Sequence, residues 1–272
     1  MSEPTSAVTP QKVTTQQTDK KKFPTEFIDL PSQGWFYPTN HPLASGQVEV
    51  KYMTAREEDI LTSANLIKKG TVIDTLINSL LVSDTDCDEL LTGDKNAVMI
   101  AARILGYGKD YDIDMNCPKC DEENKLIIDL TLLSNKELDE KLPKHTNEFE
   151  FHLPVSKTML IFKQMTGADE KKLESELKGL EKFANKQGPR KLLTTRLKHQ
   201  IIAVNGDREI KTIREFIDND LFAQDSLALR NYMREVSPDV LTKFNFECES
   251  CAHTETVDMP IDTGFFWPSS DS

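Results

Sequence analysis

Apolar residues in the N-terminal half of the chain change from one spacing to another. Val48, Val50 and Tyr52 alternate with polar neighbours, as in a strand with one buried face. Thr54 and Glu57 follow with the spacing of a capping box, in which the threonine accepts from a free helix amide and the glutamate reaches back to the threonine amide. The segment therefore predicts a strand that leads directly into an amphipathic helix.

The remaining patterns divide into helical and extended segments. Helices are predicted at about 72–82 and about 95–105, and alternation returns at Tyr111, Ile113 and Met115 before the apolar segment KLIIDL. In the C-terminal half, FEFHLP and TKFNFE are predicted as strands, and TMLIFKQM, EKKLESELKGLEKF, LKHQIIAV, IKTIREFI and DSLALRNYMREV as helices. The predicted fold class is mainly α with small β-hairpins (α+β).

Composition divides the chain into four regions. Residues 1–22 are mostly Ser, Thr, Gln and Lys with little to bury, so we expect a disordered tail. Residues 23–47 are rich in aromatic residues and proline and are expected to form an extended arm. The rest is predicted to form an N-terminal helical half, residues 48–142, and a C-terminal helical half, residues 143–272.

The most distinctive aromatic group of the chain lies in this arm. It consists of Trp35, Phe36 and Tyr37. These side chains either pack on the body of the protein or anchor a partner, because Trp and Tyr are favoured at interface centres. All three are therefore candidate partner-binding residues.

Two Cys-x-x-Cys pairs, Cys117 with Cys120 and Cys248 with Cys251, each lie at a turn between predicted strands. Such a turn presents two thiolates on the same side, and two turns complete the four-sulfur tetrahedron that zinc prefers. The pairs therefore predict one structural zinc, held in a zinc-ribbon-like clasp that joins the two halves. Replacement of one cysteine ligand by His253 remains an alternative.

Other uses of the cysteines fit the pattern less well. A redox Cys-x-x-Cys is typical of the start of a helix after a strand, and a catalytic zinc keeps an open coordination position. The fifth cysteine, Cys87, is predicted to be a small buried residue of a helical region.

The two cysteine pairs also indicate an internal pseudo-repeat. Each half ends in the order helix, strand, cysteine turn, strand. A gap-free offset of 131 residues superimposes both pairs, and it matches Ile113 and Met115 with Phe244 and Phe246. We therefore predict two pseudo-repeated halves joined by the clasp.

Charge and motif content argue against several classes of function. Asp and Glu outnumber Lys and Arg by 45 to 33, and the formal charge of -12 opposes general binding to nucleic acid or anionic membranes. We expect a soluble protein of a reducing cytoplasm, because no signal peptide or membrane-spanning apolar run is present. No phosphate loop, nucleophile elbow, His-Glu-x-x-His or dinucleotide fingerprint occurs, so we expect neither an enzyme nor a small-molecule substrate.

Two further segments were tested for sites. Residues 84–95 resemble a calcium loop, but Glu89 replaces the required glycine and Lys95 the bidentate glutamate. The basic stretch 182–200 is either a solvated helix face or a surface for nucleic acid or an acidic partner. A nucleic-acid-associated zinc-ribbon protein therefore remains the alternative function.

Several stretches together resemble a known family. They are LPSQGWFYPTNHPL, VEVKYMTAREEDILTS, KKGTVIDTLINSLL, LTGDKNAVMIAARILGYGKDYDI and CPKC, in this order. The chain resembles the T4-type baseplate proteins of contractile-tailed bacteriophages, closely over roughly residues 28–130 and more loosely beyond. The resemblance implies a late, non-enzymatic baseplate hub subunit or hub assembly protein that acts in the host cytoplasm and binds other hub, baseplate or tail proteins. Whether it stays in the virion is left open.

Overall fold

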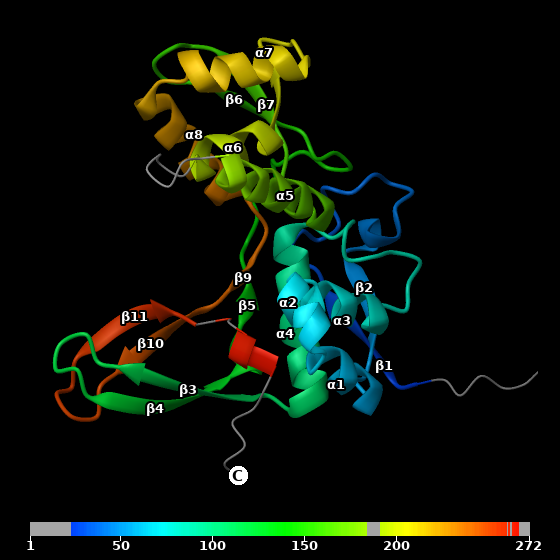
Figure 1. Ribbon diagram of the computed structural model, residues 1–272, viewed down its shortest axis with the longest axis vertical. Helices are drawn as coiled ribbons and strands as arrows, with labels where there is room; N and C mark the ends of the chain where they lie inside the picture. The colour runs from blue at the N-terminus through cyan, green and yellow to red at the C-terminus, as the bar shows by residue number, and fades with distance from the viewer. Residues whose placement is uncertain (1–22, 184–190, 260, 262, 267–272) are drawn as a thin grey trace, which may run out of the picture.

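The computed structural model describes residues 23–183, 191–259, 261 and 263–266. Two helical lobes lie one above the other, and a pair of β-hairpins projects to one side of them (Figure 1). The tail predicted at residues 1–22 lies outside the described residues.

The first lobe, residues 23–107, joins a two-stranded sheet to four helices. Its elements are β1 (Thr25–Asp29), β2 (Gln47–Lys51), α1 (Ala55–Leu61), α2 (Ala64–Lys69), α3 (Val72–Leu80) and α4 (Thr92–Tyr107), with a 3-10 turn at Pro42–Ser45. β1 pairs antiparallel with β2, and the Leu30 amide donates to the Gly46 carbonyl. The segment expected as an arm is therefore part of the lobe.

The predicted capping box is present at the start of α1. The Thr54 hydroxyl accepts from the Arg56 amide, and the Glu57 carboxylate accepts from the Thr54 amide at 2.9 Å. The helix ends at Leu61, and α2 continues the chain to Gly70, whose φ of 71° suits a residue without Cβ.

The second lobe, residues 149–236, has a three-stranded antiparallel sheet covered by helices. Its elements are β6 (Phe149–His152), β7 (Met159–Phe162), α5 (Gly167–Phe183), α6 (Leu192–Gln200), β8 (Ile201–Val204), α7 (Ile210–Glu215), a π-turn at Phe216–Asp220, and α8 (Ala223–Val236). β7 is the central strand, between β6 and β8.

Two helices predicted in this lobe are wrong. TMLIFKQM contains β7, whose residues alternate between half-buried and buried, and only the first half of LKHQIIAV is helical because β8 begins at Ile201. Both segments are short apolar runs, in which strand and helix periodicity cannot be separated by pattern alone.

The projecting hairpin module consists of two separate antiparallel hairpins. They are β3 (Asp110–Asn116) with β4 (Glu123–Asp129), and β10 (Lys243–Glu247) with β11 (Thr254–Asp258). A two-residue ladder joins β5 (Ser134–Asn135) to β9 (Val240–Leu241), and 3-10 turns lie at Leu130–Leu132 and Thr263–Phe266. The structure confirms the α+β class with small antiparallel sheets.

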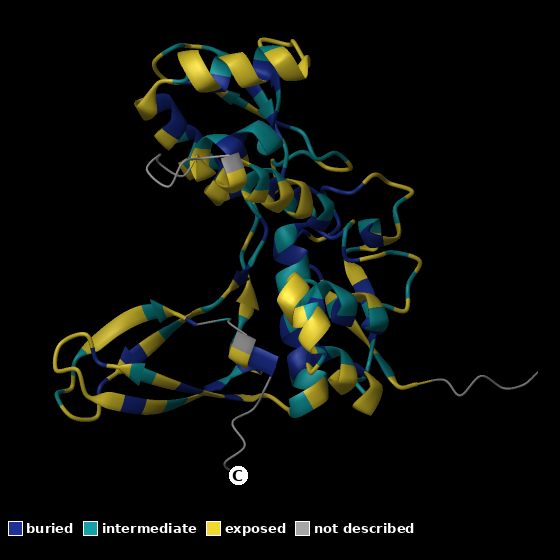
Figure 2. Cartoon of the chain, viewed as in Figure 1, coloured by how far each residue is buried: buried dark blue, intermediate teal, exposed yellow. Residues whose placement is uncertain are grey.

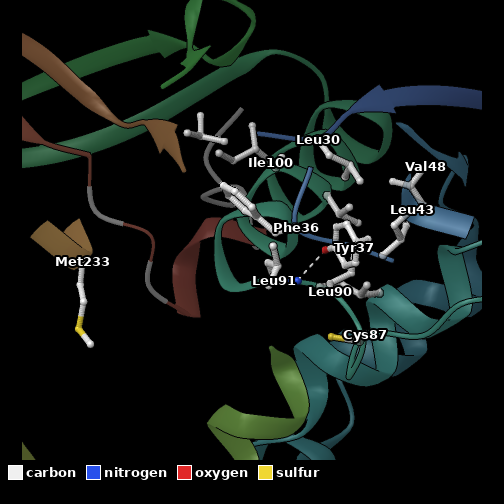
Figure 3. Close-up of a cluster of buried hydrophobic side chains, with 14 of the residues drawn as sticks. Leu30, Phe36, Tyr37, Leu43, Val48, Cys87, Leu90, Leu91, Ile100 and Met233 are labelled. Carbon is white, nitrogen blue, oxygen red and sulfur yellow. Dashed lines mark hydrogen bonds between the residues drawn. The ribbon is translucent and has the colours of Figure 1, made fainter. Parts of the chain in front are cut away.

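Aromatic side chains join the cores of the two lobes. Phe36 packs edge-on against Phe149 with ring centroids 4.9 Å apart, and Phe149 stacks on Phe162 at 5.2 Å. Tyr37 donates to the buried Asp94 carboxylate at 2.6 Å. Its hydroxyl also accepts from the Leu91 amide (Figure 3). These contacts make the first lobe and the second lobe one continuous core.

Two of the three candidate partner-binding residues need correction, because they pack on the body of the protein, which is the other alternative that the sequence left open. Phe36 and Tyr37 are buried within this chain, because the bend after Leu30 turns them beneath the lobe, where Asp94 needs a donor. Trp35 is half-buried, and the Lys144 ammonium lies 4.1 Å from its ring centroid. Only Trp35 of the three retains exposed surface.

Candidate metal centre

The two cysteine turns have the same backbone geometry. The Cys117 amide donates to the carbonyl five residues ahead, that of Glu122, and the Cys248 amide donates likewise to His253. In both turns the residue after the second cysteine has a left-handed φ, 60° at Asp121 and 52° at Ala252. The two turns therefore share one backbone hydrogen-bond pattern and one left-handed position.

All four thiols meet where the two hairpins face each other. The Sγ atoms of Cys117, Cys120, Cys248 and Cys251 lie within 4.8 Å of one another. The contacts between the turns, Cys117 to Cys251 and Cys120 to Cys248, are 3.7 Å. Zinc–sulfur bonds of about 2.3 Å in a tetrahedron place sulfur atoms about 3.8 Å apart, so the cluster fits a closed four-thiolate zinc site.

Asn124, which the sequence analysis did not identify, joins the two turns. Its Nδ2 donates to the Glu122 carbonyl and lies 3.7 Å from the Cys248 sulfur, while its Oδ1 accepts from the Glu249 amide at 3.0 Å. The side chain is buried although it is polar. Such contacts orient metal ligands, and an Asn among acidic residues gives no sequence signal of them.

The pKa values of the Cys248 and Cys120 thiols are shifted in opposite directions. Burial raises the pKa of Cys248, but the backbone amides of Cys251 and Ser250 outweigh it and lower the pKa to about 6. At Cys120 the Glu122 amide lowers the pKa, but burial and hydrogen bonds with the other thiols raise it to about 12. The Cys120 and Cys248 sulfur atoms lie 3.7 Å apart, so the protonation of one thiol affects the other.

The hairpin module has a small core of its own. Its buried residues are Cys117, Phe246 and Cys248, and the half-buried side chains of Met115, Leu126, Phe244 and Val257 pack against them. Most other positions on the two hairpins are exposed or half-buried (Figure 2), and no strand ladder runs between the hairpins. Isolated two-stranded hairpins are marginally stable in water, so the cysteine turns are the main junction between them.

The remaining candidate residues lie apart from the thiols. The His253 imidazole is 3.6 Å from the Glu255 carboxylate, and it is not part of the thiol cluster. Cys87 is fully buried in the first lobe beside Asp74, as expected, and burial raises the pKa of its thiol to about 12. In residues 84–95, the segment that resembles a calcium loop, the Asp86 carboxylate accepts from the Asp88 and Glu89 amides.

No described helix is long and apolar enough to cross a membrane. The basic stretch 182–200 includes α6, and its residues 184–190 lie outside the described part of the chain.

Comparison with known proteins supplies the family. The family model for the T4 bacteriophage base plate protein matches residues 36–267, which cover most of the first lobe, the whole second lobe and both cysteine turns. No curated protein and no solved structure matches the chain. The match covers most of the chain, and the protein therefore belongs to the T4 bacteriophage base plate protein family.

Proposed function

We propose that this baseplate protein is a hub subunit or hub assembly factor that acts through protein–protein contacts, without catalysis, and that one structural zinc fixes its hairpin module. The single observation that carries the zinc is the tetrahedral spacing of the four sulfur atoms. A shell of four thiolates leaves no position for a substrate, which supports a structural role over a catalytic one.

Zinc here would stabilise a contact between distant chain segments. Cys117 and Cys248 are separated by 131 positions, and their hairpins share no ladder. Because ligands come from both hairpins, metal binding would be coupled to their docking, as in small domains whose folding depends on metal. A rigid projecting module is a suitable surface for contacts with other baseplate or tail proteins.

We also propose that the two lobes are copies of one unit, each ending in a cysteine hairpin. In each lobe the first strand runs into a Leu-Pro turn, Leu30-Pro31 after β1 and Leu153-Pro154 after β6. The next strand leads into the same motif, Lys-x-Met-Thr-x-x-acid-Glu, at 51–58 and 163–170. Both motifs cap a helix, α1 or α5.

The side chains of the two motifs make the same bonds. Lys51 pairs with the buried Glu57 at 2.9 Å, and Lys163 pairs with the buried Asp169 at 2.6 Å. The same carboxylate also accepts from the amide of the motif's threonine, which is Thr54 in the first lobe and Thr166 in the second. The same ion pair and the same amide bond thus occur at the same positions of both motifs, which supports a common origin of the two lobes.

Later elements correspond as well. The residue after α3, Leu81, bridges β2 at Val50, and the residue after α6, Ile201, pairs with β7 at Phe162. Val50 and Phe162 each directly precede the lysine of their motif. Superposing the two lobes in an experimental structure tests the proposal, and a mismatch of these strand pairs would contradict it.

The functional proposal predicts one zinc per chain. Elemental analysis of pure protein should give that stoichiometry, and chelation should loosen the hairpins while the lobes keep their helicity. Two metal ions per chain, or none with four freely titrating thiols, would contradict the clasp. Detection of the chain in purified virions assigns a hub subunit, and detection only in assembling tails assigns an assembly factor.

A further inference from the structure

A groove of about 870 Å³ lies between α6, α8 and the chain around β9. We call it the arginine groove, after the three arginines that line it: Arg196 on α6, and Arg230 and Arg234 on α8. We propose that the arginine groove binds an acidic segment of a partner protein that carries leucine-like side chains between its carboxylates.

The charge of the groove contrasts with that of the chain. Arg196 and Arg234 are exposed, and within the residues that the structure describes none of the three guanidinium groups pairs with a carboxylate. Arg230 and Arg234 are also four residues apart on one helix, where like charges repel. Two carboxylates, those of Asp239 and Asp258, line the groove as well, but five cationic side chains outnumber them, so the lining is net positive in a protein with a net charge of -12.

Further donors face the same space. The buried Gln164 lines the groove, and its Nε2 has no partner among the described residues. Lys136, which also lines the groove, binds three carbonyls at the end of α8, those of residues 234, 235 and 237. The Lys136 ammonium is thereby already satisfied, so the donors left for a ligand are the three guanidinium groups and Gln164 Nε2, which suit carboxylate oxygens and peptide carbonyls.

Apolar side chains in the groove favour a protein over nucleic acid. Leu193 and Leu241 line it and are 43% and 47% exposed. The described lining contains no aromatic side chain on which a base could stack. A peptide segment with carboxylates beside apolar residues matches this surface. That the partner is another tail protein rests on the proposed function.

Selection from a random 12-residue peptide library tests the groove independently of the family. The parent protein should enrich peptides with several Asp or Glu and at least one large apolar residue. The double variant Arg196→Ala/Arg234→Ala should bind these peptides at least 10-fold more weakly in fluorescence anisotropy. The double variant Leu193→Ser/Leu241→Ser should also bind them more weakly, which tests the apolar part of the groove by itself. The matched control is Arg56→Ala/Lys68→Ala, which removes two exposed charges from α1 and α2 and should leave affinity unchanged.

Three results would overturn the proposal. They are enrichment of peptides without acidic residues, equal peptide binding by the parent and the arginine variant, and tighter binding of a DNA oligonucleotide that displaces the peptide. Sedimentation that shows a dimer dispersed by the arginine substitutions would identify a second copy as the occupant instead. Failure of the peptide test leaves the hub proposal intact, because copurification with tail proteins tests that separately.

Discussion

The buried carboxylates of Asp94 and Asp225 occupy the same place in the two lobes but have different partners. Each is the third residue of its helix, α4 or α8, and each accepts from the turn after the first strand of its lobe. Asp94 takes one backbone amide, from Ser32, and the Tyr37 hydroxyl. Asp225 takes two backbone amides, those of Val155 and Ser156.

This difference gives the two carboxyls opposite electrostatics. Burial dominates at Asp94 and raises its pKa, against the hydrogen bonds from Tyr37 and Ser32. Burial also acts on Asp225, but the amides of Val155 and Ser156 outweigh it and lower the pKa. In both lobes an aspartate at this position of the helix bonds to the turn after the first strand. The direction of its pKa shift depends on the donors that the turn supplies.

The largest expected effect comes from the shell that both halves share. Cys120→Ser in one hairpin and Cys251→Ser in the other should each reduce zinc from one ion per chain to none, because every ligand of a closed shell is needed. Elemental analysis and amide exchange of both hairpins measure this. Cys87→Ser is the control and should keep the metal. If only the mutated hairpin exchanges faster, the hairpins do not share one ion.

The next effect separates the two carboxyls. Asp225→Ala should cost about 1–3 kcal/mol of unfolding free energy at pH 7, because two part-buried backbone amides lose their charged acceptor. The lowered pKa places this stability above the unfolded value of 3.8, so the cost should shrink as pH falls through the folded pKa.

Asp94→Ala is the matched variant with the opposite sign. Its raised pKa means that the stabilisation is complete below 3.8 and is lost as pH rises through the folded pKa, so its cost should be greater in acid than at pH 7. Urea unfolding of each variant and the parent across this range measures both trends. Parallel pH profiles for the two variants would remove the contrast.

A smaller effect concerns the amide that only the first hairpin supplies. Asn124→Ala should weaken zinc binding about 10–100-fold, because the bonds to Glu249 and the Cys248 sulfur are lost. The offset of the cysteine pairs places Glu255 opposite this position in the second hairpin. Glu255→Ala should leave zinc affinity, measured by competition with a chelator, nearly unchanged; an equal loss would mean that Asn124 has no special role.

The smallest effect lies in the left-handed residue of each turn. Ala252→Gly should stabilise the zinc-free hairpin by about 0.5 kcal/mol, because a left-handed φ is unfavourable for alanine. Asp121→Gly should change stability less, since Asp tolerates this conformation better. Thermal unfolding of both variants distinguishes them, and a larger gain at Asp121 would reverse the ranking.

Local patterns predicted what depends on neighbouring residues. The capping box of Thr54 and Glu57 is present, as are both cysteine turns and the strands around them. β7 was missed because its apolar residues face neighbours on both sides, so no alternation of polar residues identifies a central strand. The sequence left open whether Tyr37 packs on the body or anchors a partner, because its hydrogen-bond partner, Asp94, is 57 residues away.

The proposed correspondence of the two lobes is only partly detectable from the sequence, because the segments between matching positions differ in length. The cysteine pairs and the buried aspartates share one offset, 131, but Lys51 and Lys163 are 112 apart, and Leu30 and Leu153 are 123 apart. A gap-free comparison finds the first relation and misses the others. Strand pairing does not depend on loop length, and in each lobe the first strand pairs antiparallel with the strand that leads into the lysine motif.

The separation of the cysteine pairs also sets a time order during synthesis. At 5–20 residues per second, a ribosome needs roughly 7–26 s to travel the 131 positions from Cys117 to Cys248. Through that interval only two of the four cysteines of the proposed zinc site have been made, while the second lobe is still being synthesised. The proposed clasp would therefore close last, and a nascent chain interrupted before Cys251 emerges would lack a complete set of ligands.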